Sequence, residues 1–102
     1  MIARKGDSYF KIAKELNLRL WQIYKYNDLE KGSVPNSGDI IYIQPKRNSA
    51  RDNTYIVKVG DTMHGISQLY GIKLMKLYKK NNMTFGSEPE VGQTLNLRKR
   101  VR

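Results

Sequence analysis

The spacing of apolar residues changes several times along this chain, and each change predicts the start of a new helix or strand. In the second half, β-branched and aromatic residues gather at 55–59, which predicts a short strand. Apolar side chains then recur three and four positions apart up to about Tyr70, and a second such set begins at Leu74. Two successive helices are therefore predicted. Alternating apolar and polar residues at 95–97 predict a closing strand.

The first half of the chain carries the same pattern, so the sequence contains an internal repeat. Helical spacing extends to about Leu16, and alternation returns at 41–43. Aligned at an offset of 54 residues, 2–46 and 56–100 are identical at 12 of 45 positions. A repeat of this length indicates two small structural units in tandem, which favours a binding function over a single active-site cleft.

Residues suited to helix ends stand at the predicted boundaries. Ser8 and Thr62 are placed as N-caps, where a hydroxyl accepts a hydrogen bond from a helix N–H group. Asn17 and Gly71 follow the first helices and tolerate the left-handed conformation that ends a helix. The second helices are predicted to end at Asn27 and Asn81. Arg19 and Lys73 stand at their N-cap positions, and these residue types are poor N-caps.

Each copy therefore has the order strand, helix, helix, strand. Because a helical pair connects the strands, and their apolar faces must both meet the helices, we predict a two-stranded antiparallel sheet in each copy. The predicted fold is α+β, with two βααβ modules. Module 1 is expected at 1–46, a polar linker at 47–54, module 2 at 55–98 and a basic tail at 99–102.

Composition narrows the functional classes. The chain has no cysteine, so disulfides and cysteine-bound zinc are excluded, and no apolar stretch approaches the length of about 20 residues that spans a bilayer. No targeting signal precedes the first module. We therefore expect an added start at Met1 and a fragment of a longer protein. The net charge of +10, concentrated in the second half, favours polyanionic surroundings.

The ordered set of turns, caps and apolar positions resembles the LysM (lysin motif) domain, and it occurs twice. The residues that carry the resemblance in the first copy are Lys5-Gly6-Asp7-Ser8, Ile12-Ala13, Ile23, Asn27 and Gly38-Asp39-Ile40-Ile41-Tyr42-Ile43. In the second copy they are Val59-Gly60-Asp61-Thr62, Ile66-Ser67, Leu77, Asn81 and Gly92-Gln93-Thr94-Leu95-Asn96-Leu97.

This resemblance implies that both helices of a module pack on one face of its sheet. It also implies binding of N-acetylglucosamine polysaccharide, chiefly peptidoglycan or chitin, in a shallow groove between two loops. Carried over by position, one wall of the groove comprises Gly6, Asp7, Ser8, Tyr9 and Phe10 in copy 1, and Gly60, Asp61, Thr62, Met63 and His64 in copy 2. The other wall comprises Asn27, Asp28 and Leu29, or Asn81, Asn82 and Met83.

Several residues invite a catalytic or ligand-binding interpretation that their surroundings weaken. His64 is the only histidine and has no nucleophile or metal ligand near it in sequence, so we predict no catalytic residue, metal or cofactor. Glu88 and Glu90 are expected to be solvated loop charges. Asp61, like its counterpart in copy 1, is expected to hold its own turn first. Trp21 stands one position off the apolar stripe, and we expect it to be half-buried or to contact another module.

The function predicted from the sequence is non-catalytic binding of peptidoglycan or a related N-acetylglucosamine polymer. Two basic LysM-like copies resemble the C-terminal tails of bacterial cell-wall glucosaminidases, so the fragment is expected to anchor such an enzyme in the cell envelope. The alternative is an interaction or spacer module that is held to anionic polymers by charge. Nucleic acid is disfavoured, because aromatic residues are not interleaved with the basic ones. Copy 1 is the better candidate for sugar and copy 2 for charge.

Overall fold

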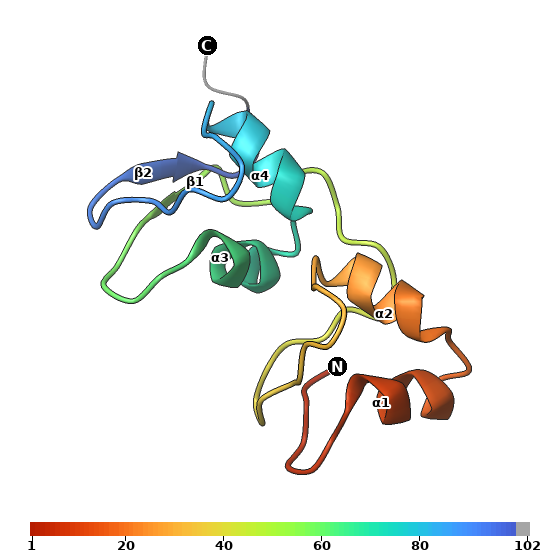
Figure 1. Cartoon of the computed structure of the whole chain (residues 1–102). Helices are drawn as coiled ribbons and strands as arrows, with labels where there is room; N and C mark the ends of the chain where they lie inside the picture. The colour runs from red at the N-terminus through yellow and green to blue at the C-terminus, as the bar shows by residue number, and fades with distance from the viewer. Residues whose placement is uncertain (100–102) are drawn as a thin grey trace. The chain divides into compact units, whose positions relative to one another are not determined.

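The computed structural model describes residues 1–99, and the chain divides into two compact units, Met1–Lys46 and Arg47–Arg102. Each unit contains one pair of helices (Figure 1). The predicted α+β class is confirmed. Of the basic tail expected at 99–102, all but Lys99 lies outside the described residues. Within the part of the chain that is described, no helix is both long enough and apolar enough to cross a bilayer.

The second unit contains the complete βααβ arrangement. Strand β1 spans Thr54–Ile56, helix α3 Met63–Tyr70, helix α4 Leu74–Lys80 and strand β2 Thr94–Asn96. The strands pair antiparallel, as predicted, in the register Thr54–Asn96, Tyr55–Leu95 and Ile56–Thr94. The strand expected at 55–59 ends early, because the chain turns through a hydrogen bond from the Asp61 N–H to the Lys58 carbonyl, at 3.1 Å.

The first unit has the same helices but less strand pairing. Helix α1 spans Tyr9–Glu15 and helix α2 spans Leu20–Tyr26. The two predicted strands are reduced to one antiparallel bridge between Ile2 and Ile40, which is the 54-residue counterpart of the Ile56–Thr94 pair. The register is therefore the same in both units. Backbone pairing continues into the predicted closing strand at 41–43, because the Ile41 N–H donates to the Met1 carbonyl at 2.8 Å and the Met1 amino group donates to the Ile41 carbonyl at 2.7 Å.

The segment expected as a linker is hydrogen-bonded to the second unit. Arg47 forms a parallel bridge with Ile72: its N–H donates to the Gly71 carbonyl at 2.8 Å, and its carbonyl accepts from the Lys73 N–H at 2.9 Å. Further along, the Ala50 N–H donates to the Leu97 carbonyl at 2.9 Å. Ala50 also packs against the apolar core of this unit.

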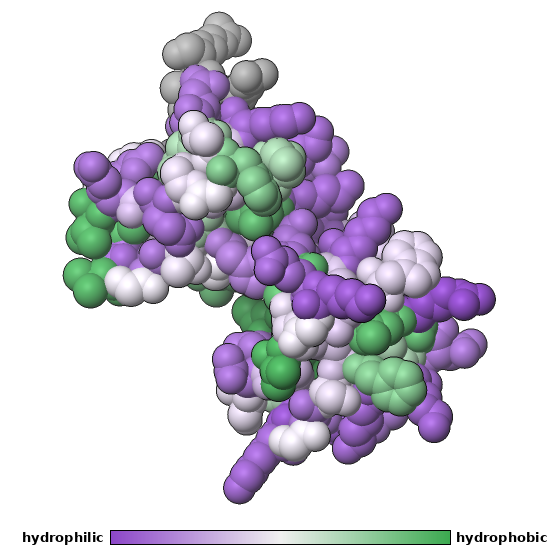
Figure 2. Space-filling model, in the orientation of Figure 1, coloured by the Kyte–Doolittle hydropathy of each residue, from purple (hydrophilic) through white to green (hydrophobic). Residues whose placement is uncertain are grey.

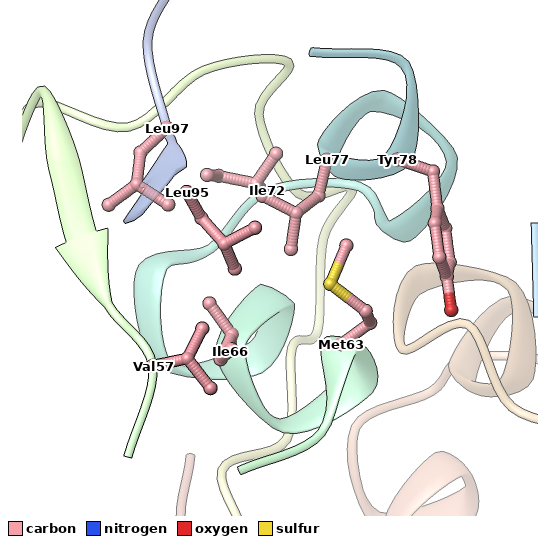
Figure 3. Close-up of a cluster of buried hydrophobic side chains, with 8 residues drawn as sticks. All are labelled: Val57, Met63, Ile66, Ile72, Leu77, Tyr78, Leu95 and Leu97. Carbon is pink, nitrogen blue, oxygen red and sulfur yellow. The ribbon is translucent and has the colours of Figure 1, made fainter. Parts of the chain in front are cut away.

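Each unit has its own apolar core, enclosed between its helices and its strands. The core of the second unit is shown in Figure 3, where side chains from both helices and both strand segments point toward one another. Met63, Ile72, Leu77 and Leu95 in this cluster are fully buried. The core of the first unit is smaller and is built from Ala3, Tyr9, Ile12, Ala13, Ile23 and Ile41. Outside these cores, hydrophilic side chains cover most of the face seen in Figure 2.

The predicted helix boundaries are confirmed by their caps. The Ser8 and Thr62 hydroxyls accept from helix N–H groups at 3.1 and 3.0 Å. Asn17 and Gly71 adopt left-handed conformations with φ of 56° and 69°. The N-cap residues of the second helices, Arg19 and Lys73, form no side-chain cap hydrogen bond, as predicted. In unit 1 the Gln22 side chain instead accepts from the Arg19 N–H at 2.8 Å.

Candidate functional site

The predicted site residues fall on two loops of each unit, which we call the first loop (6–10 or 60–64) and the second loop (27–29 or 81–83, with the residues that follow). Their side chains differ widely in exposure. Those exposed to solvent are Gly6, Ser8, Phe10, Gly60, Thr62 and Asn82. Those half-buried are Asp28, Leu29, Asp61, His64, Asn81 and Met83. Those buried are Asp7, Tyr9, Asn27 and Met63.

The aspartates of the first loops are engaged by their own turns. The Asp7 carboxylate accepts from the Arg4 backbone N–H at 2.8 Å, and this bond holds the pKa of Asp7 below its usual value. The Asp61 carboxylate accepts from the Tyr55 hydroxyl and from the Lys58 N–H at 2.8 Å. The hydroxyl bond is the main cause of a lowered pKa of Asp61, and it raises the pKa of Tyr55 to about 12. Both carboxylates therefore stabilise the loop conformation.

The first residue of each first helix points into the core, whereas the second residue of α1 points into solvent. Tyr9 and Met63 occupy equivalent positions, and both contribute to the cores. Tyr9 packs edge-on against Tyr24, with ring centroids 5.8 Å apart. Burial is the main cause of the raised pKa of Tyr9, and the Asp39 carboxylate raises it further. Phe10, one residue later, is 64% exposed.

The asparagines that end the second helices are structural links to the closing strand. Asn27 is 1% exposed; its amide group donates to the Ile23 carbonyl at 2.8 Å and exchanges two hydrogen bonds with the Tyr42 backbone. Asn81 makes the equivalent bonds to the backbones of Leu77 and Asn96. These side-chain amide groups therefore face the backbone of their own unit and are already hydrogen-bonded there.

The residue after each of these asparagines adopts a left-handed conformation, with φ of 51° at both Asp28 and Asn82. In the first unit, the Asp28 carboxylate forms an ion pair of 2.7 Å with the Lys46 ammonium group, whose side chain is 1% exposed. Burial is the main influence on Lys46 and lowers its pKa, while the Asp28 carboxylate opposes that shift. The ion pair joins the second loop to the end of the unit.

Glu88, expected to be a solvated loop charge, joins the two loops of the second unit. Its carboxylate oxygen accepts from the backbone N–H of Met63 at 3.1 Å, across 25 residues of sequence. A carboxylate is favoured at this place because the N–H groups at the start of a helix carry partial positive charge. The residue at the equivalent position of the first unit is Val34, which is 76% exposed and has no acceptor. The Val34 side chain therefore cannot form in unit 1 the bridge that the Glu88 carboxylate forms in unit 2.

Sequence reasoning missed the bridge because it depends on a contact between distant residues, although a clue was present. Where the first copy has a valine, the second has a carboxylate, at a position that the repeat aligns. Trp21 was also expected to be more buried than its 57% exposure. It lies one position off the apolar face of α2, and for that reason its ring is directed away from the core. Among residues 1–99, no cluster of metal-ligating side chains is found.

Two consecutive βααβ units, each with a capped first loop close to its second loop, define a tandem of small recognition modules. The LysM domain model matches residues 2–44 and 55–98, and the chain belongs to this family. LysM domains are modules that bind peptidoglycan and related N-acetylglucosamine polymers. The resemblance inferred from the two sets of motifs is thereby confirmed.

Similarity to individual proteins extends over nearly the whole chain. An autolysin of Enterococcus faecalis (strain ATCC 700802 / V583) is 27% identical over 103 residues, covering 92% of this chain and 14% of the autolysin. The crystal structure of the spore cortex-lytic enzyme SleL of Bacillus cereus is 31% identical, with a TM-score of 0.44, over 99% of this chain and 22% of that one. SleL of Bacillus megaterium is 20% identical, with a TM-score of 0.42, over 97% and 22%. The chain thus spans a small part of each of these proteins.

Proposed function

We propose that this chain is a non-catalytic anchor that holds a larger cell-wall protein on peptidoglycan. The observation that carries the proposal is the match of the LysM family to both units, over 2–44 and 55–98. The likeness to a protein named autolysin, of which the chain spans 14%, supports a role as one part of a longer wall-acting protein. A glucosaminidase in the cell envelope is the parent that we propose.

The proposed ligand contact lies between the first and second loops of each unit. An N-acetyl group offers a carbonyl acceptor, an amide donor and a methyl group, and backbone groups of two neighbouring loops can satisfy the first two. Gly6 and Gly60 have φ of 84° and 86°, which only glycine adopts without strain, and they keep the loop backbone accessible. Such contacts are few, so each unit is expected to bind weakly.

Two weak sites in one chain strengthen one another if both reach the same polymer. Tethering raises the effective concentration of the second site, and the avidity gain can be about 10²–10⁴. The gain depends on both units being competent, and here the units differ. In the second, the Glu88 carboxylate occupies the Met63 N–H that a ligand carbonyl could otherwise use, whereas Val34 at the equivalent position of the first has no acceptor in its side chain. We therefore propose unit 1 as the stronger sugar site.

Sedimentation with insoluble peptidoglycan tests the proposed function. The chain is expected to sediment at moderate salt, and soluble N-acetylglucosamine oligomers are expected to release it. Amide NMR of the same chain, titrated with these oligomers, is expected to shift residues of the loop pair in unit 1 at lower concentrations than those in unit 2. Failure to sediment, together with an unchanged spectrum, would contradict the proposal.

Attachment to anionic polymers by charge is the second candidate, and the surface of α4 favours it. Lys76, Lys79 and Lys80 stand on this helix, and the pKa of Lys80 is lowered by partial burial and then by the neighbouring charge of Lys76. Repulsion of this kind is relieved when an anion binds. Binding by charge weakens as salt rises, because the screening length falls from about 10 Å at 0.1 M to about 3 Å at 1 M. Retention of sedimentation at high salt would favour the sugar groove.

A further inference from the structure

A concave surface lies on the first unit, between α1 and the start of α2 and apart from the proposed ligand contact of the loops. We call it the α1–α2 hollow; its volume is about 590 Å³. Two aromatic rings line it, and both are largely in solvent: Phe10 is 64% exposed and Trp21 is 57% exposed. Ala13 and Leu18 supply further apolar lining. Exposed aromatic rings that share one hollow offer flat apolar faces and are typical of a ligand site.

The charged side chains that line the hollow are all positive. Lys14 and Arg19 both line it, Asn17 adds an exposed amide, and no carboxylate is among the lining residues. Ammonium and guanidinium groups at the edge of an apolar surface match a ligand that has a carboxylate next to an apolar face. The hollow therefore favours an anionic ligand of modest size.

The corresponding surface of the second unit is different. His64, Gln68 and Met75 stand where the first unit has Phe10, Lys14 and Trp21, so both aromatic faces and one cation are missing. The features that form the hollow are thus confined to unit 1.

Comparing the backbone donors of the two units distinguishes a peptide ligand from a sugar ligand. In unit 2, the Lys73 N–H donates to the Arg47 carbonyl at 2.9 Å, so a backbone segment pairs with this edge. In unit 1, the equivalent N–H of Arg19 donates to the Gln22 side chain at 2.8 Å, so this donor is already used. A peptide strand would have to displace that bond. A sugar that stacks on the rings and places its charge near the cations would not.

We propose that the α1–α2 hollow binds a carboxylate-bearing pyranose of a glycan chain, with the ring against Phe10 and Trp21 and the carboxylate at Lys14 and Arg19. This inference rests on the proposed function, since it adds a second contact to the glycan that the loop pair recognises. It assigns to unit 1 a preference for acidic over neutral sugar residues, which the loop pair alone does not supply.

Trp21 is the only tryptophan of the chain, so fluorescence excited selectively at tryptophan, rather than at the seven tyrosines, reports on the hollow. The complete chain would be titrated with peptide-free N-acetylglucosamine–N-acetylmuramic acid oligomers, whose muramic residues carry carboxylates, and with neutral N-acetylglucosamine oligomers of the same length. Amide NMR would follow the loop pair in parallel. We expect the acidic oligomer to change the Trp21 emission and the neutral one to leave it unchanged, while both shift the loops.

Matched substitutions identify the groups responsible. Trp21→Met and Lys14→Gln introduce the residues found at the same positions of unit 2, and Arg19→Gln removes the second cation. Lys14→Gln with Arg19→Gln is expected to weaken binding of the acidic oligomer at least about tenfold, the size of one charge-assisted hydrogen bond. The control is Arg51→Gln with Lys73→Gln, which removes the same charge from two exposed positions of unit 2 outside the lysine surface of α4. Helical circular dichroism would check that each variant is folded.

The outcomes separate the site from the general function. Unchanged Trp21 emission with shifted loop amides would overturn the α1–α2 hollow and leave the loop pair as the sugar site. An equal response of Trp21 to an acidic peptide, such as oligoglutamate, would overturn the glycan assignment in favour of a peptide. If the control variant loses as much binding as the double variant, then charge acts without the hollow. That result would also overturn the assignment of the hollow as a glycan site.

Discussion

The side-chain amide of Asn81 exchanges two hydrogen bonds with the backbone of Asn96, donating to its carbonyl at 3.0 Å and accepting from its N–H at 2.7 Å. The same amide donates to the carbonyl of Leu77, within α4, at 2.9 Å. A single side chain therefore closes the helix and attaches it to β2. Asn27 does the same in the first unit with Ile23 and Tyr42.

Asn81→Ala is expected to destabilise the second unit by about 2–4 kcal/mol, because three hydrogen bonds are lost and the Asn96 backbone groups lose their partners. Asn81→Asp retains the acceptor and should cost less. Hydrogen exchange of the buried amides in each unit measures the loss, and unit 1 amides serve as the internal reference. Full protection of unit 2 in the alanine variant would refute the structural role.

Glu88→Val places in unit 2 the residue that unit 1 has at the equivalent position, Val34. Freed from the carboxylate, the Met63 N–H becomes accessible, and unit 2 is expected to bind N-acetylglucosamine oligomers more tightly. The start of α3 should lose about 0.5–1 kcal/mol of favourable charge interaction. NMR titration of the amides at 60–64 measures the change.

Glu90→Gln is the matched control for that experiment, because its side chain is also an exposed glutamate of the same loop. It is expected to leave the affinity of unit 2 unchanged. Equal affinities in Glu88→Val and the unaltered chain would show that the carboxylate does not compete with the ligand.

The Tyr55–Asp61 hydrogen bond is expected to stabilise unit 2 only between an acid and an alkaline pH limit. The folded-state pKa of Asp61 is lowered, so its contribution is present at neutral pH and is lost as the pH falls through that value, below 3.8. The folded-state pKa of Tyr55 is raised from 10 to about 12, so its contribution is present below pH 10 and is lost as the pH rises toward 12. Urea unfolding of unit 2, followed at several pH values, tests both limits.

Tyr55→Phe removes the hydroxyl and keeps the ring that packs edge-on against Tyr70. The alkaline loss of stability that Tyr55 causes is expected to disappear, and the acid loss to become smaller, because the Lys58 N–H still bonds Asp61. An unaltered alkaline profile in this variant would show that other groups control it.

Asp28→Asn tests the ion pair with Lys46 without disturbing the backbone, since asparagine occupies the equivalent position 82 with the same φ of 51°. The variant leaves a buried ammonium group without its carboxylate. Because Asp28 is itself partly exposed, the expected destabilisation of unit 1 is about 2 kcal/mol, below the range for fully buried pairs. Hydrogen exchange of unit 1 amides, compared with those of unit 2, measures it.

Most of the fold was predictable because it depends on local features that the repeat displays twice. Caps at Ser8 and Thr62, and left-handed ends at Asn17 and Gly71, lie within a few residues of the groups that they bond or terminate. The candidate site was less predictable. Its residues share two loops as expected, but Tyr9 and Met63 serve the core, and sequence position alone does not say which way a side chain points.

The sequence by itself determined the two βααβ modules, their helix boundaries and the family, because apolar period and turn chemistry act over short distances. Only the tertiary structure decided how the copies differ. The Glu88 carboxylate bonds Met63, the 47–50 segment joins unit 2, and Phe10 shares a hollow with Trp21. Each of these depends on residues brought together from separate elements, and their distances arise only when the apolar cores have placed those elements.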